Sequence, residues 1–172
     1  MNDLESAFVH LHAHSYFSLQ EGLISPEDLV KTAKLNGMQS IALVDHRCLS
    51  GVVAFEQVCR HEDIRPIYGL EIELSWQGQQ GIIVLLAANQ EGWSNLCRLS
   101  SQVMLVDDTV GEVSIDLEIL AGNSAGLIAL TGGQRSLLDT FIHRSQEEHA
   151  LQWLAQLHDI FSDKLFIELQ QH

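Results

Sequence analysis

The sequence has few basic residues and no long hydrophobic run. Lys and Arg number 9 against 23 Asp and Glu, which gives a formal net charge of −14. Proteins that bind nucleic acid on their own neutralise phosphates with clustered Lys and Arg, so the composition argues against strong direct nucleic-acid binding. No apolar run approaches the roughly 18 to 20 residues that span a bilayer, and the acidic start does not resemble a signal peptide. We therefore expect no membrane partner.

Cysteine and proline are also scarce. The three cysteines, Cys48, Cys59 and Cys97, include no C-x-x-C pair, which argues against a disulfide framework and predicts reduced thiols in a cytoplasmic protein. With two prolines and no low-complexity linker in 172 residues, we expect one domain, 1–172. A chain of this length hides roughly 70% of its unfolded surface and needs no disulfide to fold.

Hydrophobic periodicity predicts an α/β fold. Helical patterns at about 26–36, 52–61, 93–104 and 146–161 separate most of the apolar runs. A hairpin turn is expected at 76–81, and the segment 106–124 looks loosest. The runs with strand character are 8–12, 40–45, 66–74, 82–88, 126–131 and 165–169. The order predicts a mostly parallel sheet or an incomplete barrel.

Two helices have clear local features. The first should begin at Ser25 as N-cap, with Pro26 in the first turn, and end at Gly37. Its expected apolar face is Leu29, Val30 and Ala33, and that of the last helix is Leu151, Leu154 and Leu157. We expect both faces to cover the sheet.

Candidate metal ligands follow three of the predicted strands. His10, His12 and His14 alternate at the first, so strand geometry would put all three imidazoles on one face. Asp45-His46 closes the second strand and Glu71 lies in the third, although Glu73 shares its face and spacing alone does not choose between them. Such nitrogen and oxygen ligands suit zinc or manganese. The alternatives are hydrogen-bonded or exposed histidines, a capping or turn role for Asp45, and a solvated strand end at Glu71.

At this point the chain resembles the PHP (polymerase and histidinol phosphatase) domain, as found at the N-terminus of bacterial C-family DNA polymerases, the DNA polymerase III alpha subunit and its error-prone relatives. The resemblance rests on the stretches 8–19 with Gly22, 41–46 with Leu49 and Gly51, 66–71, 84–87, 95–96 and 166–169.

The resemblance implies a distorted, incomplete TIM-like (β/α) barrel with up to three divalent metal ions at its strand ends. By position, His12, His14, His46 and Glu71 would be ligands, and Glu21 stands where the polymerase version usually has Asp. Asp45 would support the ligands, and His10 resembles a family residue that binds no metal. Zinc or manganese is the expected cofactor, with magnesium as a third candidate.

Departures from the family pattern bear on activity. Ile82 stands where metal-binding members usually have His, and Gly133 where they have a thiolate. The late Asp-x-His motif is missing, so the barrel is expected to be truncated at its C-terminus. An open edge of this kind predicts pairing: a homodimer through the C-terminal edge, or the remainder of a polymerase that supplies the missing strands.

The main functional hypothesis is a structural, partner-docking module of a DNA-directed DNA polymerase in DNA replication, with incomplete metal sites and contact to an exonuclease subunit. The alternative is a metal-dependent phosphoesterase, or a 3′-5′ exonuclease that proofreads. A barrel amidohydrolase that uses the H-x-H of its first strand is a weaker third hypothesis, because the 45–46 and 69–71 matches do not belong to it.

Overall fold

The computed structural model describes residues 8–19, 21–105 and 113–170. The chain divides into two compact units, Met1–Leu70 and Glu71–His172, and β2 (Arg65–Trp76) continues from the first into the second. The sheet has the strand order β1-β2-β3-β5-β6, with β4 beside β2. The described strands therefore do not close into a barrel, which agrees with the expected incomplete barrel.

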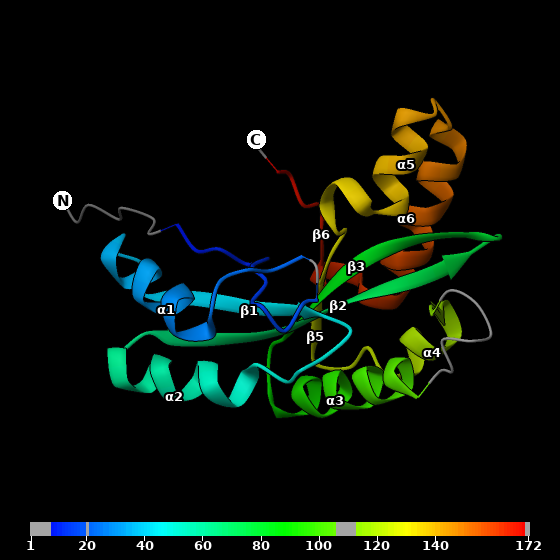
Figure 1. The fold of residues 1–172 in the computed structure, drawn as a ribbon. Helices are drawn as coiled ribbons and strands as arrows, with labels where there is room; N and C mark the ends of the chain where they lie inside the picture. The colour runs from blue at the N-terminus through cyan, green and yellow to red at the C-terminus, as the bar shows by residue number, and fades with distance from the viewer. Residues whose placement is uncertain (1–7, 20, 106–112, 171–172) are drawn as a thin grey trace. The chain divides into compact units, whose positions relative to one another are not determined.

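The first unit contains α1 (Pro26–Leu35), β1 (Ser40–His46) and α2 (Val52–Glu62), followed by the start of β2 (Figure 1). As predicted, Ser25 caps α1, because its hydroxyl accepts the Asp28 amide at 2.9 Å. The predicted face of α1 is buried, and Lys34 of α1 donates to Glu62 of α2 at 2.8 Å. Strand β1 is buried at every position except the last, so it forms the centre of this unit.

The strand predicted at 8–12 is not formed. Two β1 amides donate hydrogen bonds to this segment: Ala42 to the His10 carbonyl and Val44 to the Ala13 carbonyl, both at 2.9 Å. The two donors are two residues apart, but the two acceptors are three apart. The extra residue resembles a bulge and breaks the alternation on which the one-face prediction for the histidines depended.

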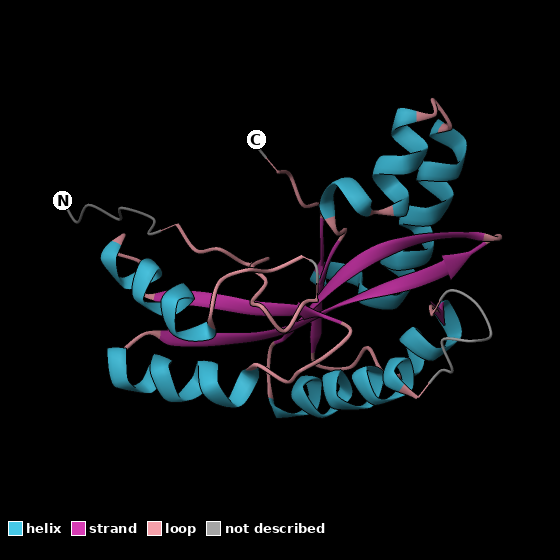
Figure 2. Cartoon of the chain, in the orientation of Figure 1, coloured by secondary structure: helices cyan, strands magenta, loops and turns pink. Residues whose placement is uncertain are grey.

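The second unit begins with the hairpin of β2 and β3 (Gln79–Ala87), whose turn lies at Gln77-Gly78 (Figure 2). Both turn residues have positive φ, 49° and 74°, as a tight two-residue hairpin requires, and this confirms the predicted turn. The chain continues through α3 (Gln90–Met104), β4 (Ile115–Asp116), α4 (Leu117–Gly122), β5 (Leu127–Leu130), α5 (Leu137–His143), α6 (Glu147–Phe161) and β6 (Leu165–Phe166).

The strand pairs of this unit make the sheet mixed. Strand β4 is parallel to β2 and β6 is parallel to β5, whereas β5 is antiparallel to β3. The fold is therefore α/β with a mostly parallel sheet, as predicted. Its core includes Phe141 and Trp153, and the half-buried ring of Trp76 lies 5.7 Å from the first and 5.6 Å from the second. Among the described residues we find no helix that could cross a membrane.

Some expectations for this unit are wrong. The predicted loose segment 106–124 contains β4 and α4, and its residues 106–112 lie outside the described part. Helix α5 was not anticipated, because the helix is only seven residues long. On α6, Leu157 is buried as expected but Leu151 is 69% exposed, because Ala150, Trp153 and Phe161 form the buried face instead. Strand β6 ends at Phe166 rather than at Leu169.

Candidate metal centre

Two imidazoles of the first unit lie near one carboxylate oxygen of Glu21. The Nδ1 atom of His14 lies 3.7 Å from Glu21 Oε2, and the Nδ1 atom of His46 lies 3.9 Å from the same oxygen. Ligands that bind one ion through bonds of about 2 Å are themselves about 3 to 4 Å apart. The spacing of these nitrogen and oxygen atoms therefore suits a shared divalent cation.

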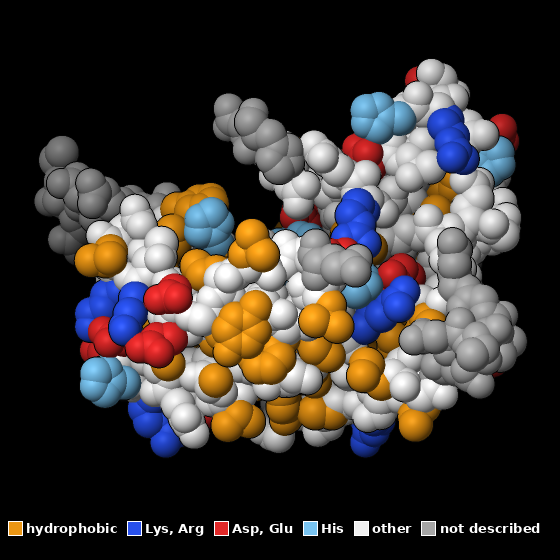
Figure 3. Space-filling view, viewed as in Figure 1, with side chains coloured by type: hydrophobic (Ala, Val, Ile, Leu, Met, Phe, Trp, Pro, Cys, Tyr) orange, Lys and Arg blue, Asp and Glu red, His pale blue; other side chains and the backbone are white. Residues whose placement is uncertain are grey.

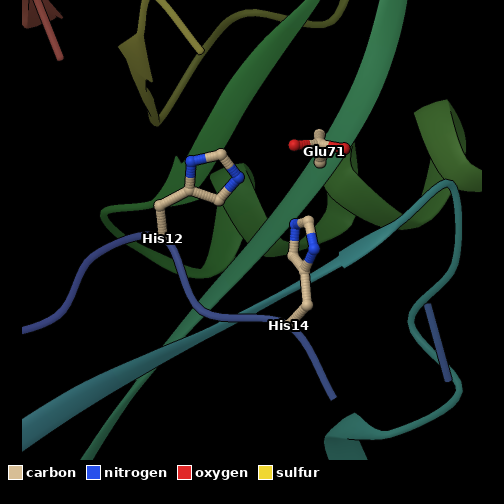
Figure 4. Close-up of side chains that lie close together, drawn as sticks. All are labelled: His12, His14 and Glu71. Atoms are coloured by element: carbon tan, nitrogen blue, oxygen red, sulfur yellow. The ribbon is translucent and has the colours of Figure 1, made fainter. Parts of the chain in front are cut away.

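His12 joins this group through His14. The two imidazole rings are 5.1 Å apart with their planes inclined at 68°, and both side chains extend from the loop that precedes α1 (Figure 4). His10 is placed differently, because its ring is exposed and packs edge-on against Phe8 at 4.8 Å. The loop thus brings together His12 and His14 and leaves His10 apart.

Backbone hydrogen bonds fold the loop that carries Glu21. The Ser18 amide donates to the Ser15 carbonyl, and the amides of Glu21 and Gly22 both donate to the Ser18 carbonyl, each at 3.0 Å. A β-carbon at Gly22 would collide with the Ser15 carbonyl oxygen. Only glycine fits this close approach, so Gly22 allows the turn that places Glu21 near the histidines.

Asp45 supports this loop from the end of β1. Its side chain is 2% exposed and accepts three hydrogen bonds: from the Ser15 amide at 2.7 Å, the Ser15 hydroxyl at 2.8 Å and the Ser18 hydroxyl at 2.7 Å. The Ser18 oxygen in turn accepts the His46 amide at 2.9 Å. Asp45 does not cap α2, whose N-cap is Gly51. Its carboxylate instead holds the loop that carries the ligands.

Glu71 directly follows Leu70 in β2 and is 1% exposed, so it is not a solvated strand end. Its carboxylate is therefore a buried acidic group of the second unit, whereas His12, His14, Glu21 and His46 belong to the first unit. Glu73, on the same strand, is half-buried.

The second unit adds a residue that the sequence analysis missed. Arg135 Nη1 lies 3.8 Å from Glu71 Oε1. Nothing in the sequence links a single arginine after Thr131-Gly132-Gly133 to a glutamate more than sixty residues earlier. The two positions that depart from the family pattern provide no ligand here: Ile82 is a buried apolar side chain and Gly133 has none.

Exposed hydrophobic side chains accompany the loop of the first unit. Leu23 is 98% exposed and Leu19 is 83% exposed. Phe8, Leu11 and Tyr16 are exposed as well. Figure 3 shows many hydrophobic side chains at the surface on the face that it displays. An apolar loop beside charged ligands is a feature of surfaces that bind another molecule.

The fold and the His14, Glu21 and His46 side chains of the first unit together indicate an α/β protein with a candidate divalent-metal centre. The chain belongs to the PHP domain family, whose model matches residues 10–172. It is 34% identical to the DNA polymerase III subunit alpha of Treponema pallidum over 96% of this chain, and 31% identical to that of Caulobacter vibrioides over 100%. An error-prone DNA polymerase from Symbiobacterium thermophilum is 32% identical over 95% of the chain. The chain spans about 15% of the length of these curated relatives.

Solved structures of low sequence identity share the fold. An amidohydrolase from Chromobacterium violaceum, 18% identical, matches with a TM-score of 0.58 over 86% of this chain and 74% of that chain. A candidate metal-dependent phosphoesterase from Bifidobacterium adolescentis, 17% identical, matches with a TM-score of 0.50 over 92% of this chain and 85% of that chain. These similarities agree with the predicted PHP-type fold and concern the fold alone.

Proposed function

We propose that this chain is the PHP module of a DNA polymerase III alpha-type protein, folding as a single PHP domain over 1–172. In this proposal it holds a divalent cation and serves mainly as a structural and docking element. The observation that carries the proposal is the Glu21 carboxylate between His14 and His46, in a loop that Asp45 organises. The relatives named DNA polymerase III subunit alpha, which the chain matches over nearly its whole length, support the polymerase context.

The donor set fits a divalent ion. His12, His14, Glu21, His46 and Glu71 offer imidazole nitrogens and carboxylate oxygens, a mixture that zinc and manganese accept more readily than magnesium does. These five residues would hold the cation, which when bound acts as a Lewis acid on a phosphoryl oxygen. Asp45 would keep the loop ligands in place through Ser15 and Ser18 and would itself bind no metal.

The incomplete ligand set favours the structural role over hydrolysis. Ile82 is 5% exposed and has no ligand atom, and at Gly133 the space for a β-carbon is filled by the side-chain amide of Gln170. Clusters that lack ligands hold fewer ions and stabilise less of the charge that develops on attacking and leaving oxygens. A phosphoesterase or 3′-5′ exonuclease remains the second candidate function, favoured by the adjacent imidazole rings of His12 and His14.

The proposed partners are the remainder of a polymerase chain and its exonuclease subunit. Strand β6 lies at the edge of the sheet order, and Phe166 is 52% exposed. An apolar sheet edge commonly pairs with another chain, so the proposal retains a homodimer through this C-terminal edge for the isolated protein. Sedimentation at micromolar concentration tests it, because a strictly monomeric and well-folded species would contradict the dimer. The proposed location is the cytoplasm, as the sequence predicts.

Metal content and hydrolysis test the function. Elemental analysis of the purified chain should find bound zinc or manganese, and a His46→Ala variant should lose it. The same protein with Mn²⁺ should release nucleotides from DNA 3′ ends, or phosphate from a simple ester, no faster than the variant does. Rapid release that His46→Ala abolishes would establish the hydrolase instead, and absence of metal from the wild-type chain would contradict the metal role.

A further inference from the structure

The second unit contains a buried carboxylate with a cation beside it. Glu71 is 1% exposed, and Arg135 Nη1 lies 3.8 Å from its Oε1. A carboxylate removed from water is costly unless positive charge or hydrogen bonds compensate it. Arginine carries that charge at every physiological pH. The Arg135 guanidinium therefore supplies Glu71 with the kind of charge that a metal ion would supply.

The backbone that carries Arg135 is fixed against β3. Gly132 and Gly133 have positive φ, 88° and 62°, and a β-carbon at Gly132 would lie 2.6 Å from the Ile82 carbonyl oxygen. The chain then forms a single 3₁₀ turn, Gly133–Arg135, closed by the Ser136 amide on the Gly133 carbonyl at 3.1 Å. Only glycine fits at Gly132, so the position of this turn is determined by packing.

The Arg135 side chain can nevertheless leave Glu71. It is 51% exposed, so about half of the side chain already contacts water. A fully buried arginine that left its carboxylate would remain a buried charge without a partner, which is costly. A half-exposed arginine is instead hydrated as it moves away. Movement of Arg135 away from Glu71 therefore removes the positive charge that opposes a second cation at this carboxylate.

We propose that Arg135 is an internal cation that competes with a divalent metal ion for the Glu71 carboxylate. Without metal, Arg135 neutralises Glu71. A divalent ion that binds Glu71 displaces Arg135, because the ion and the guanidinium are both positive and repel each other at one carboxylate. Glu71 therefore binds the metal ion with lower affinity than it would have without Arg135. The competition rests on the proposed metal role of Glu71, whereas the ion pair does not.

Thermal unfolding of chelator-treated protein tests the ion pair without metal. Arg135→Gln should lower the melting temperature, because it leaves Glu71 buried without this cation, and should lower it much less in a Glu71→Gln background. Arg144→Gln is the matched control: Arg144 lies in the same unit, is exposed and donates to Gln79 at 3.0 Å. Additive effects of the two substitutions at Glu71 and Arg135 would overturn the ion pair.

Calorimetric titration with Mn²⁺ tests the competition. Arg135→Gln should bind Mn²⁺ about fivefold or more tightly than wild type, as expected for a coupling between two cations at one carboxylate. Arg144→Gln removes the same charge elsewhere and should change the affinity far less. Unchanged or weaker binding by Arg135→Gln would overturn the competition.

The two proposals fail in different ways. If neither wild type nor Arg135→Gln binds Mn²⁺, the competition and the metal role both fail, and the unfolding measurement still decides the ion pair. If Arg135→Gln alone binds Mn²⁺, the competition is supported, while the proposal that the natural chain holds metal is contradicted.

Discussion

The Ser18 hydroxyl donates to Asp45 Oδ1 at 2.7 Å, and its Oγ accepts a hydrogen bond from the backbone amide of His46 at 2.9 Å. One side chain thereby connects the loop that carries Glu21 to the strand end that carries His46. These hydrogen bonds restrict the positions of both ligands through protein groups alone. Preorganisation of this kind reduces the ordering cost of binding.

Substitution of Asp45 should therefore weaken both folding and metal binding. Asp45→Asn replaces one acceptor oxygen by an NH₂ group, which cannot accept from Ser15 or Ser18, and should cost about 1 to 3 kcal/mol of unfolding free energy. Urea denaturation measures that loss, and Mn²⁺ titration should show weaker binding. Asp63→Asn makes the same charge change at an exposed position of the first unit and should be within about 0.5 kcal/mol of wild type. Equal stability of the two variants would contradict the role of Asp45.

Gly22→Ala should displace Glu21 and reduce metal affinity. The new methyl group would collide with the Ser15 carbonyl oxygen, which is backbone and has little room to yield. Gly122→Ala is the control, because nothing lies within 4 Å of the methyl group there and Gly122 has an ordinary φ. Mn²⁺ titration of both variants measures the effect, and full affinity in Gly22→Ala would show that the turn does not place the ligand.

Replacement of His12 and His14 together by Ala should abolish tight zinc or manganese binding. Their rings are adjacent, and His14 also lies near Glu21, so the double variant removes two neighbouring nitrogen ligands. His10→Ala serves as control, because that ring packs on Phe8 at 4.8 Å. Elemental analysis gives the stoichiometry. Undiminished metal content in the double variant would remove both histidines from the site.

Cys59 should resist thiol reagents in the native protein. Burial in α2, with the Glu56 carboxylate nearby as a smaller cause, raises the pKa of this thiol to about 12. At pH 8 almost none of it is the reactive thiolate, and the side chain has no exposed surface. Iodoacetamide labelling followed by mass spectrometry should modify Cys48, which is partly exposed, well before Cys59. Rapid native labelling of Cys59 would indicate local opening of α2.

Periodicity and capping residues predicted most of the elements, because those signals are local. Ser25 and Pro26 mark the start of α1, and the apolar run at 41–44 marks β1, which is buried as expected. The candidate ligands followed from the positions of His12, His14, His46 and Glu71 near strand ends and from the family resemblance. Within the first unit, the structure brings the imidazoles of His14 and His46 near one oxygen of Glu21.

Contacts between distant residues could not be predicted in this way. Ser15 and Ser18 are ordinary loop serines in sequence, and only the fold brings them to Asp45. The extra residue between His10 and Ala13 leaves no trace in the hydrophobic pattern. Arg135 reaches Glu71 only because a glycine pair turns the chain tightly after β5.

The two compact units also differ in chromophores. All three tryptophans, Trp76, Trp93 and Trp153, lie in Glu71–His172, whereas both tyrosines, Tyr16 and Tyr68, lie in Met1–Leu70. Tryptophan emission thus comes from the second unit alone, and the close indole rings of Trp76 and Trp153 give it a sensitive near-ultraviolet dichroism signal. Tyrosine absorbance belongs to the unit that contains the histidines. Optical spectroscopy can therefore follow the unfolding of each half in the unlabelled protein.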